Sequence, residues 1–61
     1  MNNNNVNKNY VIIAIIGDTW RRYELLRYGA QMEIDEGCVF EIVTTPMTRN
    51  EALDELEELW N

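Results

Sequence analysis

The hydrophobic pattern of this chain begins with an unbroken apolar run over residues 11–16. β-Branched side chains dominate the run, and strands that are covered on both faces read as continuous apolar segments. The pattern therefore predicts a central, doubly covered strand over 10–16. Small domains bury a smaller fraction of their unfolded surface than large ones do, about 60%, so 61 residues offer little with which to cover both faces. We therefore expect a second copy of the chain to complete this core.

Two interpretations fit residues 19–36. As a helix, this segment gathers an apolar face and places Gly37 at the position of a C-cap. As strands, residues 30–35 alternate between apolar and polar side chains, with Tyr28 and Gly29 as a turn. We favour the helix, although Gly29 would weaken its interior. The hairpin stays open as the alternative.

The end of the chain predicts a second strand and a final helix. The strand covers residues 38–45 and ends at Pro46, which cannot donate to a ladder. Thr48 and Glu51 then have the spacing of a capping box, in which each side chain bonds to the other residue's backbone N–H. Behind this cap run a row of acids and an apolar stripe, which consists of Leu53, Leu56 and Trp60 with Ala52 and Leu59 beside them. We call the acids the carboxylate ridge: Glu51, Asp54, Glu55 and Glu58.

The order strand, helix, strand, helix predicts an α/β fold: a compact β-α-β-α unit whose strands pair into a sheet shared across a homodimer. The alternative is an α+β fold with a β-meander and a C-terminal helix. Residues 1–9 hold six asparagines and are expected to be a disordered leader, and residues 10–61 a single small domain. Seven residues are expected in the core or the dimer interface: Val11, Ile13, Ile15, Phe40, Ile42, Leu53 and Leu56.

Charge is distributed unevenly along the chain. The net charge is −6, and residues 31–61 carry nine acidic side chains against one basic side chain. Acidic surfaces repel phosphate, so direct nucleic-acid binding is not expected. The better partner is a protein with a basic surface. The residues expected to bind it are the carboxylate ridge and Trp60, because tryptophan is enriched in binding hot spots.

Composition argues against catalysis. The chain has no histidine and no serine, which removes serine triads and histidine general bases. Its one cysteine, Cys38, can form no internal disulfide and suits a reducing compartment. Neither the spacing of a calcium loop nor that of a zinc site is present, so no metal or cofactor is expected. The apolar run is too short to span a membrane, and a cytoplasmic protein is expected.

Three segments resemble parts of the N-terminal half of nucleoside 2-deoxyribosyltransferase-like proteins. The segments are Ile13-Ala14-Ile15-Ile16-Gly17-Asp18-Thr19, Glu36-Gly37-Cys38-Val39 and Glu51-Ala52-Leu53-Asp54-Glu55-Leu56. The resemblance implies the family's alternating strand and helix order. It also implies a residual nucleotide site at Gly17, Asp18 and Thr19, at a helix N-terminus. Asp18 would repel a phosphate there, and the family's catalytic residues have no counterpart in these segments.

The expected function is that of a small acidic interaction protein without enzymatic activity. Its size and charge are similar in general character to those of bacteriophage proteins that inhibit host enzymes or defence systems. Such a protein would act in the host cytoplasm, binding a basic surface of a host protein. The alternative is a module that binds a nucleotide or a signalling molecule at the turn Gly17–Thr19.

Overall fold

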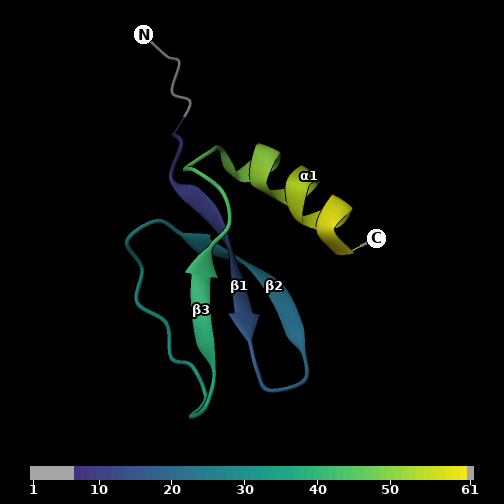
Figure 1. The fold of residues 1–61 in the computed structure, drawn as a ribbon. Helices are drawn as coiled ribbons and strands as arrows, with labels where there is room; N and C mark the ends of the chain where they lie inside the picture. The colour runs from purple at the N-terminus through teal and green to yellow at the C-terminus, as the bar shows by residue number, and fades with distance from the viewer. Residues whose placement is uncertain (1–6, 61) are drawn as a thin grey trace, which may run out of the picture.

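The computed structural model describes residues 7–60, which form a three-stranded antiparallel sheet and a C-terminal helix (Figure 1). The elements are β1 (Tyr10–Ile16), β2 (Arg21–Arg27), β3 (Val39–Ile42) and α1 (Arg49–Trp60). This is the α+β alternative, and the predicted β-α-β-α unit is wrong. The strand order is β2-β1-β3, so β1 is central as predicted, whereas a simple meander would place β2 in the middle.

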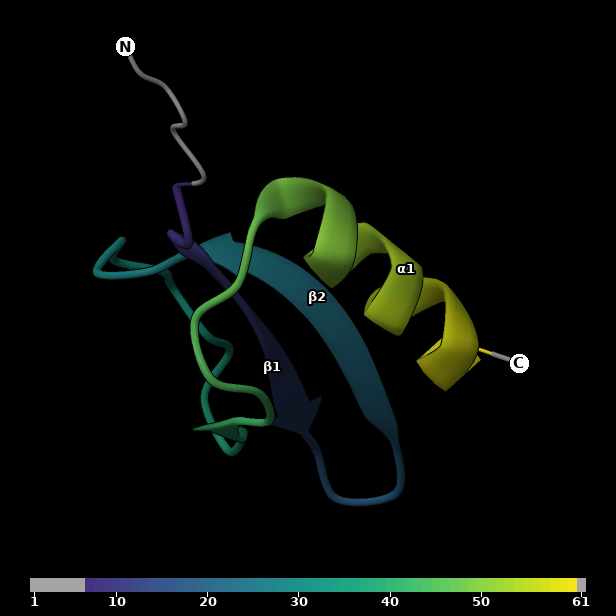
Figure 2. The same cartoon turned by 90° about the horizontal axis from the view of Figure 1, so that it is seen from above.

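β1 is covered on both faces by different parts of the chain. Val11, Ile13 and Ile15 are buried against one layer, and their packing partners include Met32, Ile34 and Cys38 from the segment between β2 and β3. Successive side chains of a strand point to opposite faces, so the buried Ile12 and Ala14 point to the other side. There α1 lies across β1 and β2 (Figure 2). Residues 11–15 of the apolar run are therefore buried within a single chain.

The segment predicted to be a helix over residues 19–36 instead forms β2 and a long irregular connection. β2 pairs with β1 along its whole length, from Tyr10 opposite Arg27 to Ile16 opposite Arg21. A central strand needs hydrogen-bonding partners along both edges, because unpaired buried backbone groups are destabilising. The next segment of the chain supplies one of them through a hairpin, closed by a bond from the Gly17 N–H to the Trp20 carbonyl (2.9 Å).

Two glycines make the turns on either side of the connection between β2 and β3. Gly29 has a φ of 87° and Gly37 a φ of 86°, values that suit the third position of a type II turn. The Ala30 N–H bonds to the Arg27 carbonyl (2.9 Å) across the first turn. The Tyr28-Gly29 turn of the alternative strand interpretation is thus present, but residues 30–35 join no strand. Gly37 is a turn residue rather than a helix C-cap.

The second predicted strand is shorter than expected. β3 covers Val39–Ile42 and pairs with β1, with Ile13 opposite Ile42. Beyond it the Thr44 hydroxyl accepts the Ile12 N–H (3.1 Å), and Met47 forms an isolated bridge with Tyr10. The chain therefore continues beside β1 past Pro46 before it enters α1.

Four of the seven expected core residues are buried in the single chain: Val11, Ile13, Ile15 and Leu56. The other three, Phe40, Ile42 and Leu53, are exposed and do not contribute to its core. Phe40 and Ile42 lie opposite Ile15 and Ile13 and share the face away from α1, where the segment between β2 and β3 packs against β1 but leaves these two exposed. Leu53 lies outside the buried face of α1. Of the predicted leader, residues 1–6 lie outside the described part of the chain, and the Asn9 carbonyl accepts the Tyr28 N–H (2.6 Å).

Candidate interaction surfaces

α1 begins with the capping box that its sequence predicts. The Glu51 N–H donates to the Thr48 hydroxyl (3.2 Å), and the Thr48 N–H donates to the Glu51 carboxylate (3.0 Å). These bonds satisfy two backbone donors that no helical carbonyl can reach. They also lower the pKa of the Glu51 carboxyl, because the backbone bond from Thr48, followed by the hydroxyl of the same residue, stabilises the charged form. The first turn of the helix is thereby held in place.

The buried face of α1 is narrower than its apolar residues suggest. Ala52 and Leu56 are buried, and Leu59 is half-buried. An α-helix turns about 100° per residue, so these three positions fall within about 60° of one another. They form the line of contact with β1 and β2. The predicted stripe of Leu53, Leu56 and Trp60 is therefore only partly correct.

The carboxylate ridge follows one exposed flank of α1. All four members are exposed, and Asp54, Glu55 and Glu58 form no ion pair with any residue in 7–60. One basic residue, Lys8, lines a shallow hollow together with Glu51, Asp54 and Glu55. Positions three and four apart on a helix are neighbours, so these like charges repel one another. The ridge is an acidic surface that the described chain leaves mostly unpaired.

Trp60 lies on the opposite flank of α1 from the ridge. Its side chain is 66% exposed, and Leu53, seven residues earlier and on the same flank, is 37% exposed. At about 100° per residue Trp60 lies roughly 120° or more around the helix from each ridge member. Trp60 therefore does not dock on the core. The structure brings the four carboxylates together, but it does not bring Trp60 beside them.

The predicted ligand site at Gly17, Asp18 and Thr19 lies in the loop of the β1–β2 hairpin. No helix begins there, so the helix N-terminus on which this prediction and the family resemblance depended is not present. The Trp20 indole packs on Gly17 so closely that a Cβ at this position would overlap the ring. The guanidinium of Arg22 lies 5.3 Å from the centre of the same ring and is paired with Glu24 (2.7 Å). Arg22 therefore pairs within its own strand.

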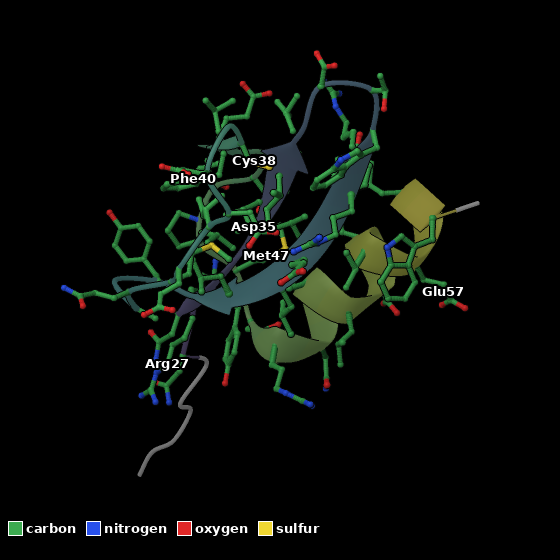
Figure 3. The ribbon with its side chains drawn as sticks, turned by 90° about the horizontal axis from the view of Figure 1, so that it is seen from below. Arg27, Asp35, Cys38, Phe40, Met47 and Glu57 are labelled. Atoms are coloured by element: carbon green, nitrogen blue, oxygen red, sulfur yellow. The ribbon has the colours of Figure 1, made fainter. Side chains whose placement is uncertain are left out.

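β3 exposes an apolar surface that includes Phe40 and Ile42, two of the residues expected in the core or the dimer interface. Its apolar side chains and that of the next residue are between 42% and 62% exposed: Val39, Phe40, Ile42 and Val43. Phe40 lies on the side of the molecule away from α1 (Figure 3). Beside it is an open apolar hollow of about 630 Å³, whose lining includes Phe40, Ile42, Val11 and Met32. Alternation in the sequence could not reveal this exposure, because apolar residues occupy both faces of β3.

The described residues provide little for metal chemistry. No group of three or more His, Cys, Asp or Glu side chains within residues 7–60 could hold a metal ion. The thiol of Cys38 is unpaired and partly buried, and it packs against the cluster around Ile13. Across the same residues, no helix is long and apolar enough to cross a membrane.

The features that remain are surfaces for binding: the carboxylate ridge, the flank of Leu53 and Trp60, and the apolar strand β3. Comparison of the chain with protein-family models, with curated proteins and with solved structures found no match.

Proposed function

We propose that this chain is a small interaction protein without enzymatic activity, which binds a basic surface of another protein through the carboxylate ridge of α1. One observation carries the proposal. Asp54, Glu55 and Glu58 extend from one exposed flank of a capped helix, and no described residue forms an ion pair with them. Such a row of unpaired like charges destabilises the free helix slightly.

A basic partner would reverse the sign of this contribution. Each repulsive pair at i, i+3 or i, i+4 costs a few tenths of a kcal/mol in the free helix. Arginine or lysine side chains placed against the ridge would neutralise it. Complementary charge of this kind accelerates association and selects the partner. The net charge of −6 supports the same preference for a basic surface.

The exposed part of α1 suits a groove better than a flat surface. Trp60 lies at one end of the exposed arc and the ridge at the other, so a single partner must straddle the helix to contact both. Grooves that receive an amphipathic helix bind in this way. In this proposal the groove has basic walls for the ridge and an apolar edge for Trp60. Blocking a basic nucleic-acid groove of a host defence enzyme, by a phage-encoded protein, is the biological role that we propose.

Capture from bacterial lysate tests this proposal. The test variant is Asp54→Asn/Glu55→Gln/Glu58→Gln, which removes three charges from the ridge with little change of shape. The matched control is Glu33→Gln/Asp35→Asn/Glu36→Gln, which removes three charges from exposed positions between β2 and β3. We expect the wild-type chain and the control to capture one specific protein and the ridge variant to lose it. Equal capture by the ridge variant would overturn the proposal.

Trp60→Ala tests the second contact with the same partner. Because Trp60 is exposed, this substitution should leave the fold intact. Truncation of an interface tryptophan commonly weakens binding by 2 kcal/mol or more, about 30-fold in Kd. Titration of the captured partner with the wild-type and variant chains would measure this change. An unchanged Kd would remove Trp60 from the binding surface and leave the ridge alone.

A further inference from the structure

The two outer strands of the sheet differ in how their free edges are protected. β2 carries four charged side chains among its seven residues: Arg21, Arg22, Glu24 and Arg27. Charges on an edge strand prevent other chains from pairing with it. β3 carries one charged side chain, Glu41, and its apolar side chains are exposed. The edge of β3 is thus left open to another strand, and the edge of β2 is not.

The backbone of β3 offers hydrogen bonds along this open edge. The Val43 N–H donates to the Ile12 carbonyl (2.7 Å), so the backbone groups of Val43 point toward β1. Hydrogen-bonded and non-hydrogen-bonded pairs alternate along an antiparallel ladder. With Ile13 opposite Ile42, this alternation turns the N–H and C=O groups of Phe40 and Ile42 away from β1. No described strand pairs with them on that side.

We propose that a second copy of the chain occupies this edge. Its β3 would pair antiparallel with the first β3 across a two-fold axis, joining two three-stranded sheets into one of six strands. A copy of the same strand has the same unpaired backbone groups and the same exposed apolar side chains. One contact therefore satisfies both chains, which is the property of a two-fold interface. An extended peptide in the same place would pair one of its own edges with β3 and leave its other edge unpaired.

Glu41 selects the register of this pairing. An axis at Glu41 would place the two carboxylates directly opposite each other, which is destabilising. An axis at Ile42 would draw in Thr44, which lies outside β3 and whose hydroxyl already accepts the Ile12 N–H. An axis at Phe40 separates the two carboxylates and keeps the pairs from Val39 to Glu41 within β3. It places Phe40 beside its copy and Glu41 opposite Val39 of the partner, and it ends at Cys38, whose N–H bonds to the Asp35 carbonyl (3.1 Å).

The Phe40-centred register also uses the apolar hollow. Phe40 and Ile42 form its wall on the side of β3. Side chains opposite each other in a hydrogen-bonded pair lie on the same face of the sheet. The second Phe40 would therefore lie at the mouth of the hollow and shield the exposed apolar side chains there. This proposal does not depend on the carboxylate ridge, and either could fail without the other.

Sedimentation of the purified full chain at micromolar concentrations tests the dimer. We expect the mass of two chains for the wild type and that of one chain for Phe40→Lys/Ile42→Lys, because lysine on an edge strand opposes pairing. The matched control is Leu53→Lys, an exposed apolar position on α1, and it should remain dimeric. Circular dichroism would verify that each variant is folded. A wild-type chain that is monomeric throughout overturns the proposal and leaves an extended peptide of another protein as the occupant of the edge.

Cross-linking tests the register with a variant that replaces a single apolar side chain of β3. In a Cys38→Ser background, Phe40→Cys would place two thiols opposite each other across the axis. The Cα atoms of a hydrogen-bonded antiparallel pair are about 5.5 Å apart, a separation that a disulfide spans. We expect mild oxidation to link this variant into a covalent dimer and to leave Cys38→Ser/Trp60→Cys mostly unlinked. Failure of the first variant to cross-link overturns the Phe40-centred register.

Discussion

At the scale of single residues, Glu51 shows how a local hydrogen bond becomes a pH dependence. Its pKa lies below the ordinary value because the Thr48 N–H and hydroxyl favour the carboxylate, with a smaller contribution from Lys8. A group whose pKa is lowered by folding stabilises the native state above its unfolded pKa. That stabilisation is lost as the pH falls through the folded pKa. Glu51 therefore supports the fold at neutral pH and not in acid.

The prediction concerns Glu51→Gln. Glutamine keeps the shape of a capping box but has no charge to lose. We expect the wild type to be the more stable chain at neutral pH and its advantage to shrink between about pH 5 and pH 3. Thermal unfolding of both chains at a series of pH values measures the difference. A constant difference across this range would contradict the assignment.

At the scale of elements, α1 has three distinct flanks rather than an inner and an outer side. One flank packs on the sheet through Ala52 and Leu56, one carries the ridge, and one carries Leu53 and Trp60. Two leucines of the same helix thus have different roles. Leu56 is 5% exposed and holds α1 on the sheet, whereas Leu53 is 37% exposed in the single chain.

Leu56→Ala and Leu53→Ala form a matched pair, since both make the same change in the same helix. Truncation of a buried leucine lowers the free energy of unfolding by about 2–5 kcal/mol. At the exposed position the loss should be within about 0.5 kcal/mol. Urea unfolding of both variants at one protein concentration compares them. Equal losses would show that Leu53 is buried in the folded protein, and would contradict this placement of α1.

At the scale of the whole molecule, the two proposed interfaces should respond to salt in opposite ways. Binding through the ridge joins opposite charges, whereas dimerisation brings together two chains of net charge −6. Screening becomes strong beyond a Debye length of about 10 Å at 0.1 M salt. We expect added salt to weaken capture of the basic partner and to tighten the β3 dimer. Sedimentation and partner titration at low and high salt measure both. A dimer that weakens with salt would indicate an interface held by opposite charges instead.

How much of the fold could be predicted depended on the range of the interactions involved. The central strand, the Tyr28-Gly29 turn and the capping box each depend on residues within a few positions of one another. The ambiguity of residues 19–36 could not be resolved in this way, because their apolar spacing fits a helix and their alternation fits strands. The pairing of β1 with β2 decided in favour of a strand over 21–27. This pairing joins residues as far apart in the sequence as Tyr10 and Arg27.

Among the candidate surfaces, too, the one that depends on local spacing was predictable and the one that depends on tertiary packing was not. The ridge was predictable because its spacing alone places the acids on one flank of a helix. The exposure of Phe40 and Ile42 was not, because it depends on how much of the sheet face away from α1 is covered by the connection between β2 and β3.

By itself the sequence determined the local conformations and the charge of each segment, since both arise from neighbouring residues. Only the tertiary structure decided which apolar residues are buried. The apolar run of β1 is covered by α1 on one face and by the segment between β2 and β3 on the other. These two leave β3 exposed, and β3 is where we propose that a second chain pairs.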